Sequence, residues 1–127
     1  MNSTSRTIAS ILLAAVWISI SEFLRNQILF PHYWTEHYNA LGITFPSAPV
    51  NGAVWGIWAL CYAVCIFVVA RKFSLIETFL LSWLFGFVLM WLVIGNLGVL
   101  PYSLLYAAIP LSLLESFGAS FIVKKMM

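Results

Sequence analysis

An acidic and a basic residue interrupt the first hydrophobic run of this chain of 127 residues. The run extends from Thr7 to Phe30, and Glu22 and Arg25 lie three residues apart near its end. On a helix this spacing places both side chains on one face, where they can neutralise each other. Because charged groups are expensive in hydrocarbon, other apolar segments must shield that face. The pair therefore predicts a bundle of helices and excludes a protein with a single transmembrane helix.

Composition indicates that the whole chain belongs in a lipid bilayer. Hydrophobic residues make up 63% of the sequence and charged residues 8%, whereas an ordinary soluble domain has roughly 25% charged residues. At about 20 residues per span, the apolar runs use the whole length and leave no room for a soluble domain. We therefore expect an all-α integral membrane protein, with residues 1–127 forming a single transmembrane domain, a four-transmembrane-helix bundle. The expected spans are residues 7–30, 51–70, 75–97 and 103–123.

The segment between the first two runs is too polar and too broken to span. It covers residues 31–49 and carries aromatic side chains that suit the lipid headgroup region. Glycine tolerates the left-handed conformation that often follows a helix. We therefore expect a short amphipathic loop helix over residues 35–41 on the outer face, ended by Gly42.

The second and third runs are joined by only a few residues around Arg71 and Lys72, so we expect a tight antiparallel hairpin. Small residues on one side of a helix let another backbone come close. We therefore expect the small-residue face of the second run to pack against another helix, and a homodimer through such faces is a further expectation. The residues of this face are Gly52, Gly56, Ala59 and Ala63.

Basic residues are distributed unevenly between the two sides of the expected bundle. Cytoplasmic loops of membrane proteins carry an excess of Lys and Arg, so both termini should be cytoplasmic. We expect the inner (plasma) membrane of a bacterium as the location and the lipid bilayer as the main partner. The net charge of +2 is too small and too scattered for a nucleic-acid partner. The residues that share the expected cytoplasmic side are Arg6, Arg71, Lys72, Lys124 and Lys125.

Polar residues gather toward the outer ends of the expected spans. At a rise of about 1.5 Å per residue, Glu22 and Arg25 lie in the outer half of the first span. Asn26 continues the same stripe, and Asn96 lies at the outer end of the third span. We therefore expect an outward-facing polar pocket. The alternative is that these side chains only tie helices together and extend to the outer interface.

A second acid, Glu115, lies near the centre of the fourth span. We expect no cation at its depth, so its carboxyl group should be protonated or heavily hydrogen-bonded. Such a group can serve proton coupling or ligand binding, and the plainer alternative is a neutral acid that hydrogen-bonds helices together. The predicted ligand-binding residues are Glu22, Arg25, Asn26, Asn96 and Glu115.

No set of residues in the sequence indicates an enzyme. An intramembrane enzyme that uses Glu22 or Glu115 as acid or base is a third alternative. We find no nucleophile, metal set or cofactor motif for it, so we expect no catalytic residue, metal or cofactor. His32 and Glu36 are four residues apart, but two ligands without a third make a poor metal site. Cys61 and Cys65 fall inside the second span, and we interpret them as packing residues.

Two functions from different classes are compatible with these patterns. In the first, a small polar or amphiphilic ligand binds in the outward-facing pocket or passes through it, as in a transporter or channel. In the second, the chain is a non-catalytic membrane scaffold or accessory subunit whose polar residues only lock helices. A closed, dry polar cluster would favour the scaffold, and lipid or ligand density beside Glu22 and Arg25 would favour ligand binding.

Overall fold

The computed structural model describes residues 2–127, and all regular structure in that range is helical. Four helical segments are long and apolar enough to cross a membrane, which confirms the predicted all-α, four-segment architecture. The first segment comprises α1 (Ser3–Phe23) and η1 (Leu24–Leu29), and the second is α3 (Pro49–Ala70). The third comprises α4 (Leu75–Trp83), η2 (Leu84–Val88) and α5 (Leu89–Asn96), and the fourth comprises η3 (Tyr102–Leu104) and α6 (Leu105–Met126).

Local sequence signals account for several helix ends. Asn2 caps α1 by accepting a hydrogen bond of 2.7 Å from the Ser5 amide. Ser74 and Glu77 form a reciprocal capping box at the start of α4. Pro49 is the first residue of α3. Proline suits this position, because the backbone N–H groups of the first turn have no hydrogen-bond partner within the helix. Gly98 follows α5 with a φ of 79°, which only glycine adopts without strain.

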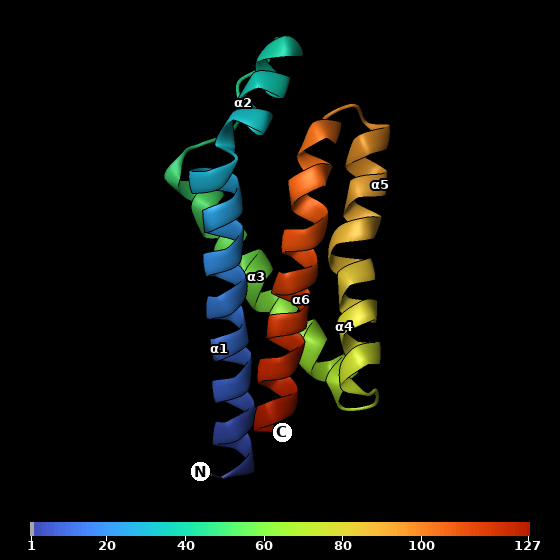
Figure 1. Cartoon of the computed structure of the whole chain (residues 1–127). Helices are drawn as coiled ribbons and strands as arrows, with labels where there is room; N and C mark the ends of the chain where they lie inside the picture. Colours follow the sequence, from blue (N-terminus) through green and yellow to red (C-terminus); the bar gives the residue numbers. More distant parts are fainter. Residues whose placement is uncertain (1) are drawn as a thin grey trace.

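The connection between the first two segments contains helix α2 (Pro31–Ala40). It begins earlier than the predicted residue 35, because the fixed φ of Pro31 suits the first turn of a helix. Gly42 lies just beyond its end with a φ of 78°. Helix α2 stands at the end of the molecule opposite to the two termini (Figure 1).

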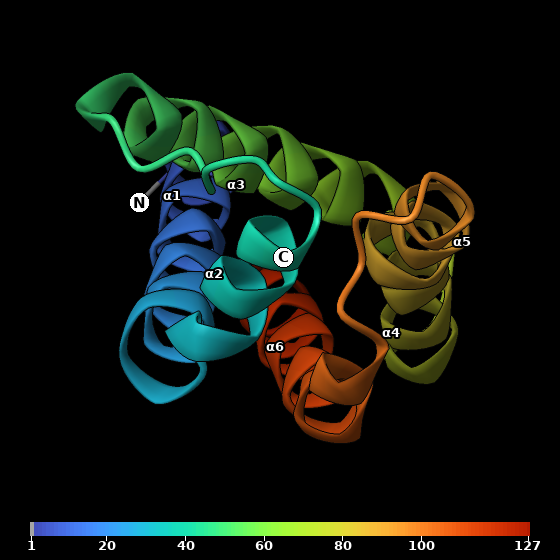
Figure 2. The same ribbon diagram turned by 90° about the horizontal axis from the view of Figure 1, so that it is seen from above.

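The long helices are not four parallel rods. Seen from above, α1, α6 and the α4–α5 segment are viewed nearly end on, whereas α3 is viewed from its side (Figure 2). Helix α3 crosses behind the others and contacts α1, α6 and α4 (Figure 1). Its connection to α4 is short, as predicted, but the two helices diverge from the turn and do not form the expected tight hairpin. The reason is that the buried face of α3 packs mainly across α1 and α6.

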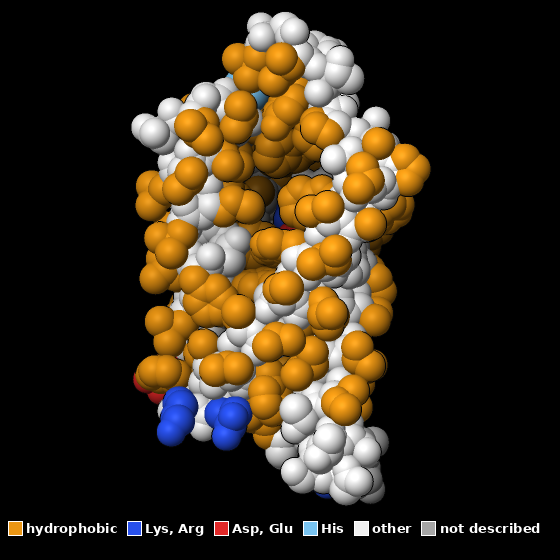
Figure 3. All heavy atoms as spheres, turned by 180° about the vertical axis from the view of Figure 1, so that it is seen from behind, with side chains coloured by type: hydrophobic (Ala, Val, Ile, Leu, Met, Phe, Trp, Pro, Cys, Tyr) orange, Lys and Arg blue, Asp and Glu red, His pale blue; other side chains and the backbone are white. Residues whose placement is uncertain are grey.

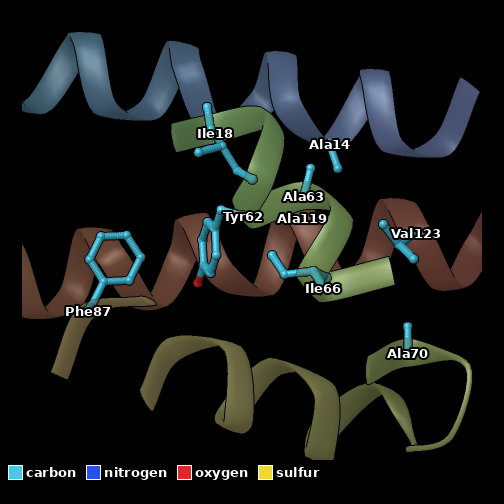
Figure 4. Packing of buried hydrophobic residues seen from close by; sticks show 10 residues of the cluster. Ala14, Ile18, Tyr62, Ala63, Ile66, Ala70, Phe87, Ala119 and Val123 are labelled. Carbon is cyan, nitrogen blue, oxygen red and sulfur yellow. The ribbon is translucent and has the colours of Figure 1, made fainter. Parts of the chain in front are cut away.

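The core lies where α1, α3 and α6 cross (Figure 4). Ala14, Ala63 and Ala119 are fully buried there, and their small side chains let the three backbones come close. Glycine permits two further close approaches. The Tyr62 ring packs against Gly86, where an added Cβ would lie 2.5 Å from Tyr62 Cε1, and the Trp17 indole packs against Gly118.

Two expectations for α3 are wrong. Gly52 and Gly56 are exposed, and an added Cβ would have nothing within 4 Å at either position, so only Ala59 and Ala63 of the predicted small-residue face are packed. Cys61 and Cys65 are free and exposed, so they are not packing residues. Both differences have one cause. Because α3 crosses the other helices at a steep angle, they do not cover its first turns or one side of its middle.

Hydrophobic side chains dominate the face of the molecule that is shown in Figure 3. In that view Lys and Arg side chains gather at the lower end, where Figure 1 places both termini. A hollow in the upper half shows a little charged surface at its floor, surrounded by hydrophobic side chains. On this face, the charged side chains are therefore seen in two places, one end of the bundle and a recess within it.

Candidate functional site

Three charged side chains meet inside the bundle. Arg25 Nη2 lies 2.8 Å from Glu22 Oε1, and Arg25 Nη1 donates a hydrogen bond of 3.1 Å to Glu115 Oε1. The residues are 6%, 8% and 0% exposed for Arg25, Glu22 and Glu115, respectively. We call this group the Glu–Arg–Glu cluster. The predicted pairing of Glu22 with Arg25 is confirmed, and the structure adds Glu115 to it.

The expectation that Glu115 has no cation at its depth is wrong. Side chains on a helix lean toward its N-terminus, so the long Arg25 side chain extends back along the first segment toward the middle of the bundle. There it reaches Glu115 on α6. Distance along the helix axis, measured between backbone positions, therefore underestimates how far an arginine can reach.

Two helical segments that contact the cluster or contribute to it are locally widened. Arg25 belongs to the π-helical segment η1, and Phe87 belongs to the second such segment, η2. The Arg25 guanidinium carbon lies 5.5 Å from the centre of the Phe87 ring, which is fully buried. π-Helical turns are rare and are frequent at functional sites. Both π-helical segments were missed from the sequence, because no residue preference predicts a π-helical turn.

A line of hydrogen bonds connects the cluster to α2. Asn26 donates to Glu22 Oε2 at 3.0 Å, and Trp34 of α2 donates to Asn26 Oδ1 at 2.9 Å. His37, also on α2, lies 2.8 Å from the Gly98 carbonyl oxygen, to which its ring nitrogen donates. Helix α2 is therefore held both to the first segment and to the turn between α5 and α6.

Buried donors fix α6 against its neighbours. Trp17 of α1 donates to the Glu115 backbone carbonyl at 2.9 Å. Tyr62 of α3 donates to the Ser82 carbonyl at 2.8 Å and lies 3.0 Å from Ser116 Oγ. Because these polar groups are paired across helices, they hold Glu115 at a defined place beside Arg25.

Two carboxylate oxygens of the cluster are incompletely satisfied. Glu115 Oε2 is buried and has no hydrogen-bond partner within residues 2–127. Glu22 Oε1 contacts Arg25 Nη2 but lacks the alignment of a hydrogen bond. Buried polar atoms normally have partners, so both atoms call for an explanation.

A cavity of about 470 Å³ opens beside Glu22. It lies between α1, η1, the start of α3 and the preceding loop, and both exposed glycines of α3 form part of its wall. Glu22 is part of the lining, whereas Arg25 and Glu115 are not. Most of the lining is apolar, and its polar side chains are Ser19, Glu22, Asn26, Gln27, Ser47 and Asn51.

The structure brings together four of the five predicted ligand-binding residues. Glu22, Arg25, Asn26 and Glu115 form one connected network. Asn96 is exposed at the end of α5 and takes no part in that network. Asn96 therefore ends a helix, as predicted, but it is separate from the cluster.

No protein-family model, curated protein or solved structure matches this chain. Within the described residues, no three His, Cys, Asp or Glu side chains are placed to hold a metal ion. The functional argument therefore depends on the Glu–Arg–Glu cluster and the cavity beside it.

Proposed function

We propose that this protein resides in a membrane and binds a small amphiphilic ligand in the cavity beside Glu22, as part of a transporter-like function. The membrane setting is supported by four long apolar helices and by the many large apolar side chains exposed on them. In water, so large an apolar surface would drive aggregation. In hydrocarbon it is the expected outer surface of a helix bundle.

The orientation follows from the basic end of the molecule. The termini and the turn holding Arg71 and Lys72 lie at one end, opposite α2 (Figure 1). Because cytoplasmic loops of membrane proteins carry an excess of Lys and Arg, we infer that this end faces the cytoplasm, and we propose the plasma membrane of a bacterium as the location. Helix α2 then lies at the outer headgroup region, with its aromatic side chains in the interface and its polar side toward water.

The single observation that carries the proposal is a carboxylate in the wall of an otherwise largely apolar cavity. The volume of about 470 Å³ falls within the usual range for small-molecule sites, about 300–1,000 Å³. Glu22 and the amide oxygens of Asn26 and Asn51 offer acceptors, and Phe23 and Trp55 offer apolar surface. This lining favours a ligand with a cationic or hydrogen-bond-donating head and an apolar body.

The scaffold alternative is supported by a different observation. Arg25 is enclosed by Glu22, Glu115 and the Phe87 ring, and it does not line the cavity. Such a cluster can act purely to fix the register of α1 against α6. The two functions differ in one testable respect, because a scaffold needs no ligand at Glu22.

Binding of octyltrimethylammonium tests the proposal, because its permanent charge and short alkyl chain match the cavity. The full chain is placed in nanodiscs of zwitterionic lipid, and saturable binding of the radiolabelled probe is compared with empty nanodiscs. Glu22→Gln should weaken binding by at least about tenfold, equivalent to about 1.4 kcal/mol. The matched control is Glu36→Gln, which removes an exposed acid on α2 and should leave binding unchanged. Absence of saturable binding to the folded wild-type protein would favour the scaffold.

A further inference from the structure

The Glu–Arg–Glu cluster contains one more acid than base. Glu22 and Glu115 both contact the guanidinium of Arg25. With all three groups ionised, the cluster carries one negative charge on buried side chains, which is unfavourable. One additional positive charge would make it neutral.

The two incompletely satisfied oxygens provide a place for that charge. Glu22 Oε1 and Glu115 Oε2 are buried acceptors without a hydrogen-bonded donor among residues 2–127. A protonated carboxyl group becomes a donor as well as an acceptor. Two carboxyl groups at one site commonly share a single proton for this reason.

The surrounding elements supply no other positive charge within the described range. From α3, Tyr62 faces this region, and its hydroxyl already donates to the Ser82 carbonyl. From η2, the facing residue is Phe87, and α2 reaches the cluster only through Trp34 and Asn26. The α2 histidine His37 is engaged with the α5–α6 turn. The neutralising charge must therefore arrive from outside.

The cavity gives that charge a route to one member of the cluster. Glu22 lines the cavity, whereas Glu115 is fully buried behind it. A cationic ligand head in the cavity would therefore pair with Glu22. The ligand head would then contribute one positive charge, as a proton bound by the two carboxyl groups does.

We propose that the Glu–Arg–Glu cluster exchanges a bound proton for the positive charge of the ligand. Without ligand, one proton is shared by Glu22 and Glu115. When a cation pairs with Glu22, the carboxylic O–H bond breaks, both carboxylates are ionised, and the proton passes to the aqueous phase. With its proton, the ligand-free cluster is neutral. Without the proton, the cluster and the bound cation are neutral together. The proton and the cation therefore exclude each other. This inference rests on the proposed function and defines its ligand class as cations.

Proton release on ligand binding tests the exchange. Octyltrimethylammonium is added to the full chain in zwitterionic nanodiscs, in a weakly buffered solution that contains a pH indicator. We expect about one proton released per cation bound. The apparent affinity should rise by up to about tenfold per pH unit while the cluster still holds its proton, since proton and cation compete. Octanol, which has the same chain length without charge, should release no protons.

Two variants separate the exchange from binding alone. Glu115→Gln leaves Glu22 and Arg25 as a neutral pair, so proton release should disappear and cation affinity should become independent of pH. Glu36→Gln is the control and should behave like the wild type. Cation binding without proton release would overturn the exchange and leave the proposed function intact. Absence of saturable cation binding would overturn the proposed function itself. If Glu115→Gln fails to fold, the pH dependence of wild-type affinity decides the question without it.

Discussion

The guanidinium of Arg25 and the ring of Phe87 are stacked 5.5 Å apart, and each residue lies in a π-helical segment of its own helix. A π-turn inserts one extra residue into a helix and rotates the side chains that follow. The two widened segments therefore meet where the Phe87 ring packs over Arg25, on the side of the third helical segment.

Replacing Phe87 tests the importance of this contact. Phe87→Leu keeps an apolar side chain but removes the ring, and a desolvated cation–π contact is worth about 2 kcal/mol. We expect a clear loss of thermal stability in detergent, measured by the unfolding temperature. Phe117→Leu is the matched control, because that ring is partly exposed at 38% and packs away from Arg25. Equal losses in both variants would show that Arg25 gains nothing from the ring.

Replacing Arg25 tests whether it stabilises both Glu22 and Glu115. Arg25→Leu leaves two buried carboxylates without their cation and should destabilise the protein by about 3–5 kcal/mol. Adding Glu22→Leu still leaves Glu115 without a partner, so recovery should be incomplete. The triple variant that also carries Glu115→Leu should recover most of the loss. Unfolding temperatures of the three variants check this order, and full recovery in the double variant would mean that Glu115 is not coupled to Arg25.

Two glycines should respond in opposite ways to the same small change. Gly56→Ala adds a methyl group into open space, and the better helix propensity of alanine should stabilise the protein by up to about 1 kcal/mol. Gly86→Ala would force the added Cβ against the Tyr62 ring and should destabilise by about 1–3 kcal/mol. Thermal unfolding of both variants measures the contrast. A loss of stability in Gly56→Ala would indicate that a second chain covers this part of α3.

Cysteine labelling in whole cells tests the orientation. The exposed native thiols are first removed as Cys61→Ala and Cys65→Ala. In that background, Ser47→Cys should react with an impermeant maleimide from outside, because the loop before α3 lies at the end opposite the termini. Phe73→Cys, in the turn between α3 and α4, should react only after the membrane is opened. Reaction of both positions in intact cells would contradict the proposed topology.

The apolar runs were enough to predict the helices, because bilayer-length segments with few charges leave few alternatives to a helical bundle. The pairing of Glu22 with Arg25 could also be predicted, since it depends only on spacing within one helix. The contact with Glu115 could not. It requires the rotation of α6 against α1, which is fixed by the Trp17 hydrogen bond and the π-helical turn at Arg25.

The buried face of α1 illustrates the same limit on a smaller scale. In the sequence, the small and polar residues Ala15, Ser19 and Glu22 form one helical stripe, and such a stripe predicts the face that packs against other helices. The residues that are buried in the bundle are instead Ser10, Ala14, Ile18 and Glu22. The two stripes share Glu22 and otherwise differ by one position. Sequence polarity favoured Ser19, whereas the actual face is set by close packing of Ala14 and Ile18 against α3 and α6, which depends on the partner helices.

The steep crossing of α3 also determines from where a ligand would approach. The cavity is lined by residues of α1 and by the uncovered glycines Gly52 and Gly56, so we expect it to open between these two neighbouring helices on the side of the bundle. A molecule dissolved among the lipid tails would meet this opening directly. The concentration that governs occupancy would then be the concentration in the bilayer. Apparent affinity, expressed against total ligand, should accordingly increase with alkyl chain length while the contacts at Glu22 stay the same.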